Sequence, residues 1–156
     1  MEIRLAQVRD IPGMIALLHQ VGEVHHVIRP DIFRAGACKY DEAALEQLLT
    51  DETKPIFVAD DNGFVAGYCF CQIQNNPGNS VLTARKEIYI DDLCVDENCR
   101  GQGIATKLYA HVTNFAKQLH CDYITLNVWC GNDNAMKFYE KSGMTARNIH
   151  MEMKLC

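Results

Sequence analysis

Several features that define whole classes of protein are missing from this sequence of 156 residues. No run of apolar residues approaches the roughly 20 that a membrane-spanning helix requires, and the first residues contain no apolar secretory core. The eight cysteines include no C-x-x-C pair, which argues against a zinc site and against a disulfide framework. We therefore expect a single domain over residues 1–156, located in the cytoplasm, with free thiols and no bound metal.

Positive charge is also in short supply. The sequence has 15 lysines and arginines against 20 acidic residues, for a net charge of −5 at pH 7, and no segment is rich in basic residues. Such a chain repels nucleic acid, so we expect neither a nucleic acid nor a membrane as a partner. The acidic balance suits a cationic acceptor such as an amine.

Hydrophobic periodicity predicts alternating strands and helices. Strands are predicted at residues 3–8, 56–60, 64–73, 87–95 and 123–129, with one or two more within 144–155, and helices at residues 11–22, from about 41, at 104–119 and at 133–142. The pair Asn62-Gly63 predicts a tight hairpin between two of these strands. The order β-α-α-β-β-β-α-β-α-β-β predicts an α/β protein with a mixed sheet and helices on both faces.

The most distinctive stretch is the glycine-rich turn RGQGIA, residues 100–105, between a predicted strand and a predicted helix. A helix that begins at such a turn leaves amide N–H groups without carbonyl partners, and these groups, with the helix dipole, bind phosphate. Gly101 and Gly103 have no Cβ, so the backbone can lie directly against a ligand. An ordinary strand-to-helix turn also needs glycine, so the glycines alone leave both interpretations open.

The surrounding residues distinguish between the known phosphate motifs. A Walker loop is absent, and the third glycine of a dinucleotide fingerprint is replaced by Thr106. Arg100, Gly103 and Ala105 instead satisfy the pattern [QR]-x-x-G-x-[GA]. This pattern resembles the pyrophosphate-binding motif of the GNAT superfamily of N-acetyltransferases. The segment N-x-x-A-x-x-F-Y-x-x-x-G-M at residues 132–144 and the opening IRLAQVRDI are similar to further segments of that family.

The resemblance implies the GNAT fold, in which a central, mostly antiparallel sheet splays apart between its fourth and fifth strands. Here those strands are residues 87–95 and 123–129, and the gap between them would hold the pantetheine arm of acetyl-CoA. Asn132 would bond the same arm, although asparagine is equally suited to cap a helix. The cofactor-binding residues implied by the resemblance are the main chains of Leu93 and Val95, with Arg100, Gly101, Gln102, Gly103, Ile104, Ala105, Thr106 and Asn132.

Acetyl transfer to an alkylamine, whose conjugate acid has a pKa of about 10, requires a base. Glu87 and Asp91 are four residues apart on one strand and share a face, whereas Asp92 points the other way unless a bulge intervenes. By resemblance, Glu87 matches the general-base glutamate of the family's histone acetyltransferases, and Asp91 matches the acidic position of the polyamine acetyltransferases. Both remain candidates, and each could instead be a solvated carboxylate at a strand end.

Tyr139 matches the family's general acid, because a phenol is protonated at neutral pH and can donate to a thiolate. Its alternative is packing within an amphipathic helix. By resemblance, a backbone N–H near residues 93–95 polarises the thioester carbonyl. His25, His26 and Arg29 fall where the family places much of its acceptor site, but a polar surface loop is the simpler interpretation.

The sequence therefore predicts an acetyl-CoA-dependent N-acetyltransferase that acts on a primary amine of a small molecule or a protein by direct transfer in a ternary complex. Two alternatives stay open: a non-catalytic acyl-CoA-binding module with the same fold, and a generic nucleotide-binding domain. The identity of the amine acceptor and assembly into a homodimer are not decided by the sequence.

Overall fold

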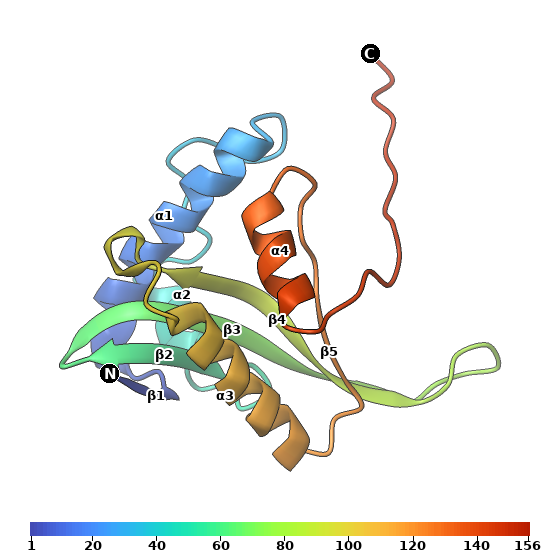
Figure 1. The fold of residues 1–156 in the computed structure, drawn as a ribbon, viewed down its shortest axis with the longest axis horizontal. Coiled ribbons are helices and arrows are strands. Elements are labelled where there is room, and N and C mark those ends of the chain that lie inside the picture. The colour runs from blue at the N-terminus through green and yellow to red at the C-terminus, as the bar shows by residue number, and fades with distance from the viewer.

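The computed structural model describes residues 1–156 and shows one sheet with helices on both of its faces (Figure 1). Its elements are β1 Glu2–Leu5, η1 Val8–Asp10, α1 Ile11–Ile28, α2 Glu42–Leu48, β2 Ile56–Asp61, β3 Phe64–Asn76, β4 Arg85–Val95, η2 Glu97–Cys99, α3 Ile104–Gln118, β5 Tyr123–Leu126 and α4 Asp133–Lys141. The five strands lie in chain order, antiparallel up to β4, and β5 pairs with β4 in parallel. The predicted mixed, mostly antiparallel sheet is confirmed. None of the helices combines the length and apolar character needed to cross a membrane.

A hydrophobic core lies on each face of the sheet, because side chains alternate along every strand. In β3, Tyr68 and Phe70 pack with α1 and α2, whereas Cys69 and Cys71 pack with α3. The buried residues of α3 recur at helical spacing and are Ile104, Leu108, Val112 and Ala116. The two cores hold β4 between α1 and α3, and this strand carries most of the predicted catalytic groups.

Several local predictions are confirmed. Asn62 and Gly63 both adopt positive φ, at 54° and 92°, as the tight hairpin between β2 and β3 requires. The side chain of Asp41 accepts a hydrogen bond from the Ala44 N–H and caps α2. After α4, Gly143 has a φ of 92°, which suits glycine just beyond the end of a helix.

The first helix is longer than predicted, because α1 continues past Gly22 to Ile28. From the sequence alone, Gly22 favours a helix that ends near this residue. In the structure a Cβ on Gly22 would lie 2.7 Å from the carbonyl oxygen of Ala37. Gly22 therefore permits the loop after α1 to approach the helix closely, and it does not terminate the helix.

The prediction of one or two strands within residues 144–155 is wrong. Apolar side chains recur there at every second position, but residues 145–156 take part in no backbone hydrogen bond within the chain. In the same way, β5 ends at Leu126 instead of residue 129, because its pairing with β4 stops at Ile90. A strand needs a neighbour for its hydrogen bonds, and side-chain periodicity alone does not supply one.

Candidate active site

The sheet opens between β4 and β5. Residues Glu87–Ile90 pair with Tyr123–Leu126, and the pairing then stops although β4 continues to Val95. The splay expected between the fourth and fifth strands is present, and it leaves one side of the end of β4 without a neighbouring strand.

The end of β4 presents main-chain groups to this opening. The Asp96 N–H donates to the Ala66 carbonyl of β3 at 2.9 Å. Because an antiparallel ladder alternates, the main chains of Leu93 and Val95 then point away from β3. Gln20 Nε2 donates to the Val95 carbonyl at 2.9 Å. The N–H groups of Leu93 and Val95 and the carbonyl of Leu93 have no partner strand, so they can bind an extended amide-containing ligand.

A cavity of about 890 Å³ occupies the opening. Its wall combines the second half of α1, the loop after it, the end of β4, the residues that follow β5, α4 and part of the C-terminal segment. Its volume falls within the range of about 300–1,000 Å³ that is typical of small-molecule and cofactor sites. The lining side chains with acid, base or donor chemistry include His25, Arg29, Asp91, Asp92, Asn132 and Tyr139.

A β-bulge brings two adjacent carboxylates to this cavity. Phe70 of β3 lies opposite Asp92, whereas the next residue, Cys71, lies opposite Ile90. Asp91 is therefore an extra residue on β4, and the alternation of side chains reverses there. Asp92, which would point away from the cavity on a regular strand, lines it together with Asp91.

The sequence contains a signal for this bulge that regular alternation overlooks. Ile88 and Ile90 pack on the α3 face, and so do Leu93 and Val95. Apolar residues thus occupy even positions before the bulge and odd positions after it. This change of parity identifies a bulge between them and places Asp92 on the opposite face, which is the face that lines the cavity.

The Asp92 carboxylate accepts a hydrogen bond but has no cationic partner. None of the ion pairs in the structure, which extend to 4.0 Å, involves it. The hydroxyl of Tyr68, which is fully buried, donates to Asp92 Oδ2 at 2.6 Å. Burial raises the pKa of Asp92, and the Tyr68 hydrogen bond and the neighbouring His25 and Lys39 lower it only in part. A carboxylate with a raised pKa is a stronger proton acceptor. The sequence analysis did not select this residue.

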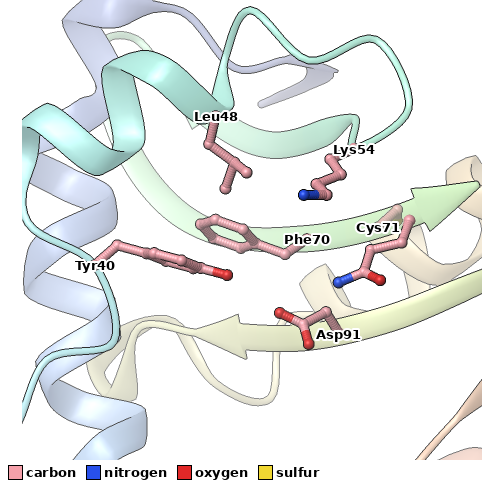
Figure 2. A pocket seen from close by; sticks show the side chains of 7 residues that line it. Tyr40, Leu48, Lys54, Phe70, Cys71 and Asp91 are labelled. Carbon is pink, nitrogen blue, oxygen red and sulfur yellow. The ribbon is translucent and has the colours of Figure 1, made fainter.

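Asp91, in contrast, is ion-paired at the cavity edge. Lys39 Nζ contacts its Oδ2. Figure 2 shows Asp91 also beside a small recess that Tyr40 and Phe70 help to enclose. The recess has a volume of about 10 Å³, which is room for no more than a water molecule. Asp91 therefore reaches the large cavity with its charge partly neutralised.

Glu87 does not line the cavity. Its Oε2 lies 2.7 Å from Arg85 Nε as an ion pair, although the two groups are not aligned as a hydrogen bond. The Arg85 guanidinium also lies over the ring of Tyr123, 4.0 Å from its centroid. The carboxylate of Glu87 is thus held near the paired part of β4 and β5, and its role as a base stays a prediction.

Tyr139 of α4 offers a free hydroxyl to the cavity. The tyrosine hydroxyls that hydrogen-bond within the chain are those of Tyr68 and Tyr89. The ring of Tyr139 packs edgewise on Tyr109, with centroids 6.1 Å apart. Burial raises the pKa of Tyr139, and the nearby negative charge of Asp92 adds to this effect. The phenol therefore keeps its proton at neutral pH and can donate it.

The start of α3 presents amide groups without partners. The amides of residues 100–106 donate to no backbone acceptor, and the first that does so is that of Lys107, to the Gly103 carbonyl at 3.0 Å. Gly101 and Gly103 have φ values of 78° and 74°, and a Cβ on either would meet no atom within 4 Å. The first turn has no acidic residue, and Arg100 is exposed beside it. This arrangement can hold the phosphates of a ligand.

Asn132 caps α4, since its Oδ1 accepts a hydrogen bond from the Ala135 N–H at 3.3 Å. Asn132 also lines the cavity, and its side-chain nitrogen makes no hydrogen bond within the chain. The capping interpretation is confirmed, and a contact with the cofactor arm stays a prediction that is compatible with it.

The prediction of a polar surface loop at His25, His26 and Arg29 is wrong, because both histidines lie in the last turn of α1 and Arg29 is its C-cap. His25 and Arg29 line the cavity. His26 does not, and its Nδ1 lies 2.7 Å from the carbonyl oxygen of Phe33. Arg29 is paired with Asp31 at 2.7 Å and with Glu152 of the C-terminal segment at 2.6 Å. His25 and Arg29 are therefore in a position to contact an acceptor, and His26 organises the loop.

Comparison with known proteins identifies the chain's relatives. The model of the Acetyltransferase (GNAT) family matches residues 23–144, most of the chain. The crystal structure of a mutant of the BH1408 protein from Bacillus halodurans superimposes with a TM-score of 0.95 at 32% identity, covering 100% of both chains. N-alpha-acetyltransferase 30 of Schizosaccharomyces pombe is 34% identical over 87 residues, which cover 56% of this chain and 55% of that protein.

A more distant structure shares the fold alone. The aminoglycoside N-acetyltransferase AAC(6')-Iy, crystallised in complex with CoA, has a TM-score of 0.71 at 16% identity and covers 99% of this chain and 100% of its own. The chain spans about half the length of the curated relatives it matches.

Proposed function

Because this chain belongs to the GNAT family of acetyltransferases, we propose that it transfers an acetyl group from acetyl-CoA to a primary amine of a small molecule or a protein. One observation carries this proposal: the free hydroxyl of Tyr139 and the unpaired carboxylate of Asp92 line the same cavity. One group holds a proton and the other can accept one. Amide formation from a thioester requires both a proton acceptor and a proton donor.

The residues at the start of α3 fit the diphosphate of CoA. The free amides of residues 100–106 and the open space in front of Gly101 and Gly103 support this assignment. Arg100 would add a charge-assisted hydrogen bond. The main chains of Leu93 and Val95 would bond the amide groups of the pantetheine arm, as a further strand would, and so lead the thioester into the cavity.

The transfer step assigns a role to each polar group in the cavity. Asp92 accepts the proton of the incoming ammonium, and the neutral nitrogen forms a bond to the thioester carbonyl carbon. A backbone N–H near Leu93 donates to the carbonyl oxygen as negative charge develops there. The C–S bond then breaks, and Tyr139 donates its proton to the leaving sulfur. The nitrogen loses its second proton as the amide forms, and this proton replaces the one that Tyr139 gave to sulfur. Of the two protons that the ammonium loses, one therefore ends on the thiol and the other leaves from Asp92 to solvent, so the step balances.

Direct transfer is favoured over an acetyl-cysteine intermediate. Cys38 and Cys130 line the cavity, but neither has a hydrogen-bonded base, and the Cys38 thiol donates to the Tyr40 carbonyl at 3.2 Å. Burial raises the pKa of Cys94 to about 12, which makes its thiolate scarce at neutral pH. A thiol without an activating base is a poor candidate for a covalent intermediate.

The acceptor is proposed to be cationic before reaction. Asp91 and Asp92 are adjacent carboxylates on the cavity wall, and the net charge of the chain is −5. An ammonium group is attracted to such a wall at short range. The names of two similar proteins refer to N-alpha groups and to aminoglycosides, so peptide N-termini and small amines both belong among the acceptors to be tested.

The test is release of free thiol from acetyl-CoA over a panel of amines, comprising a diamine, an aminoglycoside, free amino acids and peptides with free N-termini or lysines. We expect amine-dependent thiol release that saturates with one class of acceptor. Binding of CoA in calorimetry without thiol release for any amine would identify a binding module. Displacement of CoA by ATP or NAD at comparable concentrations would identify a general nucleotide-binding domain instead.

A further inference from the structure

An amine that belongs to the chain itself lies in the candidate active site. Lys39, in the loop after α1, is the only lysine among the residues that line the large cavity. Its Nζ contacts Asp91 Oδ2 at 2.5 Å, and Asp91 is the neighbour of Asp92 on the bulged part of β4. The ammonium of Lys39 therefore occupies the part of the cavity wall to which a cationic acceptor would be attracted.

Lys39 is also close to the candidate base. Burial raises the pKa of Asp92, and the positive charge of Lys39 is among the influences that lower it in part. An opposite charge has such an effect only at short range, so the two groups are near neighbours. Because Asp91 and Asp92 are adjacent, rotation about the bonds of the flexible lysine side chain can carry Nζ from one carboxylate to the other.

The pair with Asp91 holds Lys39 only loosely. The side chain of Lys39 is 47% exposed, and an ion pair with a half-exposed member contributes little to stability. Burial lowers the pKa of Lys39, but the hydrogen bond and the charge of Asp91 outweigh this effect and raise it. The amine is thus protonated at neutral pH and reacts only after it gives up a proton. This makes Lys39 a slow acceptor, and a free amine that reaches Asp92 would outcompete it.

We propose that Lys39 is a site of self-acetylation, which takes the acetyl group when acetyl-CoA is bound and no other acceptor occupies the cavity. This inference rests on the proposed function, since it uses the same groups. A bond forms between Nζ and the thioester carbonyl carbon, and the C–S bond breaks. Of the two protons that the ammonium loses, one ends on the thiol of CoA and the other leaves through Asp92 to solvent. The product amide carries no charge, so Asp91 then lacks its cation.

The experiment incubates the full chain with acetyl-CoA alone and locates acetyl groups by peptide mass spectrometry. Lys54 is the matched internal control. It is 45% exposed and lies with Asp91 at the small recess of Figure 2, but it does not line the large cavity. We expect acetylation of Lys39 to exceed that of Lys54 at least about tenfold, because only Lys39 is held in the site. Equal acetylation of the two lysines would overturn the proposal, since it would indicate unassisted reaction with acetyl-CoA.

Two further measurements test whether the site performs the reaction. In Tyr139→Phe the departing thiolate lacks its proton donor, so acetylation of Lys39 should slow at least about a hundredfold, whereas that of Lys54 should not change. The rate constant for Lys39 should be the same in dilute and in concentrated protein, because the amine and the site belong to one chain. Wild-type acetylation of Lys39 in the variant, or a rate constant that rises with protein concentration, would overturn the proposal.

Measurements of thiol release separate this inference from the proposed function. Lys39→Arg keeps a cation beside Asp91 but removes the amine, so thiol release without added acceptor should fall at least about tenfold. A saturating acceptor should suppress acetylation of Lys39 in the wild-type chain, because both amines need the same place. Amine-dependent thiol release from a chain whose Lys39 stays unmodified would overturn the inference and leave the proposed function intact. Absence of both reactions would overturn both.

Discussion

Acidic side chains near β1 and on β4, toward opposite ends of the strand order, are held in different ways. At the β1 side, Arg4 donates to both oxygens of Asp10 at 2.7 and 2.9 Å and to Asp60 at 2.8 Å. Burial opposes ionisation of Asp10, but the hydrogen bonds from Arg4 hold its pKa below the usual value, and they lower the pKa of Asp60 as well. At the β4 side, Asp92 accepts a hydrogen bond from Tyr68 and meets no cation, and burial raises its pKa.

This contrast separates groups that stabilise the fold from groups that can react. Carboxylates that accept several hydrogen bonds, including those from an arginine, stay ionised and have little capacity left for a substrate. A half-buried carboxylate without a cation lowers stability, and it persists where proton transfer requires it. The same reasoning applies to Tyr68, whose hydroxyl is bonded, and Tyr139, whose hydroxyl is free. Single substitutions can change the stabilising groups and the reactive groups separately.

The largest effect is expected for Tyr139→Phe. The substitution keeps the ring and its packing against Tyr109 but removes the proton donor. General acid catalysis contributes about 10²–10⁴-fold, so kcat should fall within that range while affinity for acetyl-CoA is retained. Stability should change little, because the hydroxyl makes no hydrogen bond within the chain. A variant with the wild-type kcat under conditions where chemistry is rate-limiting would show that Tyr139 only packs.

Arg4→Met tests the cluster of Arg4, Asp10 and Asp60 near β1. Arg4 and its two partners are at most 14% exposed, and removal of one member of a buried cluster leaves uncompensated charge. We expect the free energy of unfolding, measured in urea, to fall by about 3 kcal/mol. Arg9→Met is the matched control, because Arg9 is 66% exposed and 4.0 Å from Asp60, and it should cost less than about 1 kcal/mol.

The same cluster predicts an acid dependence of stability. The folded-state pKa values of Asp10 and Asp60 are lowered, so their contribution is present above the unfolded value of about 3.9. It should be lost as the pH falls through the lower folded values. In Arg4→Met this dependence should be weaker. An unchanged dependence in the variant would place the acid-sensitive groups elsewhere.

Gly103→Val should lower affinity for CoA by at least about tenfold, or about 1.4 kcal/mol in calorimetry. The branched side chain would occupy the open space in front of the free amides. Positive φ makes valine strained at this position, so Gly63→Val is the matched control: Gly63 also has positive φ and open space but lies in the β2–β3 hairpin. Equal loss of CoA binding in both variants would point to strain and not to the phosphate site.

Tyr68→Phe should have the smallest effect. The Tyr68 hydrogen bond lowers the pKa of Asp92, so its loss should raise that pKa further. Because a hydrogen bond to the ionised form favours that form, its loss should move the acid limb of the kcat/KM profile to higher pH. A limb that stays in place would mean that another group controls it.

Local signals predicted most of the fold. The helical spacing in α3, the Asn62-Gly63 hairpin and the glycine-rich turn each depend on a few neighbouring residues, and each was predicted from them. The length of α1 was not, because Gly22 serves a contact with Ala37 that is distant in sequence. The lack of a strand in the C-terminal segment was not predicted either, because side-chain periodicity does not reveal whether a neighbouring strand is present.

The candidate site was predicted in part for the same reason. Tyr139 and the residues at the start of α3 follow from short motifs, and the structure brings Tyr139, Asn132 and Leu93 to one cavity. Asp92 was overlooked because a single extra residue on β4 reverses the alternation. The ion pair of Asp91 with Lys39 depends on a loop whose course the sequence does not specify.

The most direct test of the account compares kcat/KM from neutral to alkaline pH for Asp92→Asn, Asp91→Asn and Glu87→Gln. These substitutions keep size and hydrogen bonding, and Asp91 and Glu87 differ from Asp92 in having a cationic partner. We predict that Asp92→Asn alone loses about 10²-fold or more near neutral pH and recovers at alkaline pH, where the amine deprotonates unaided. A wild-type profile for Asp92→Asn, with the loss appearing in Glu87→Gln or Asp91→Asn, would contradict the account.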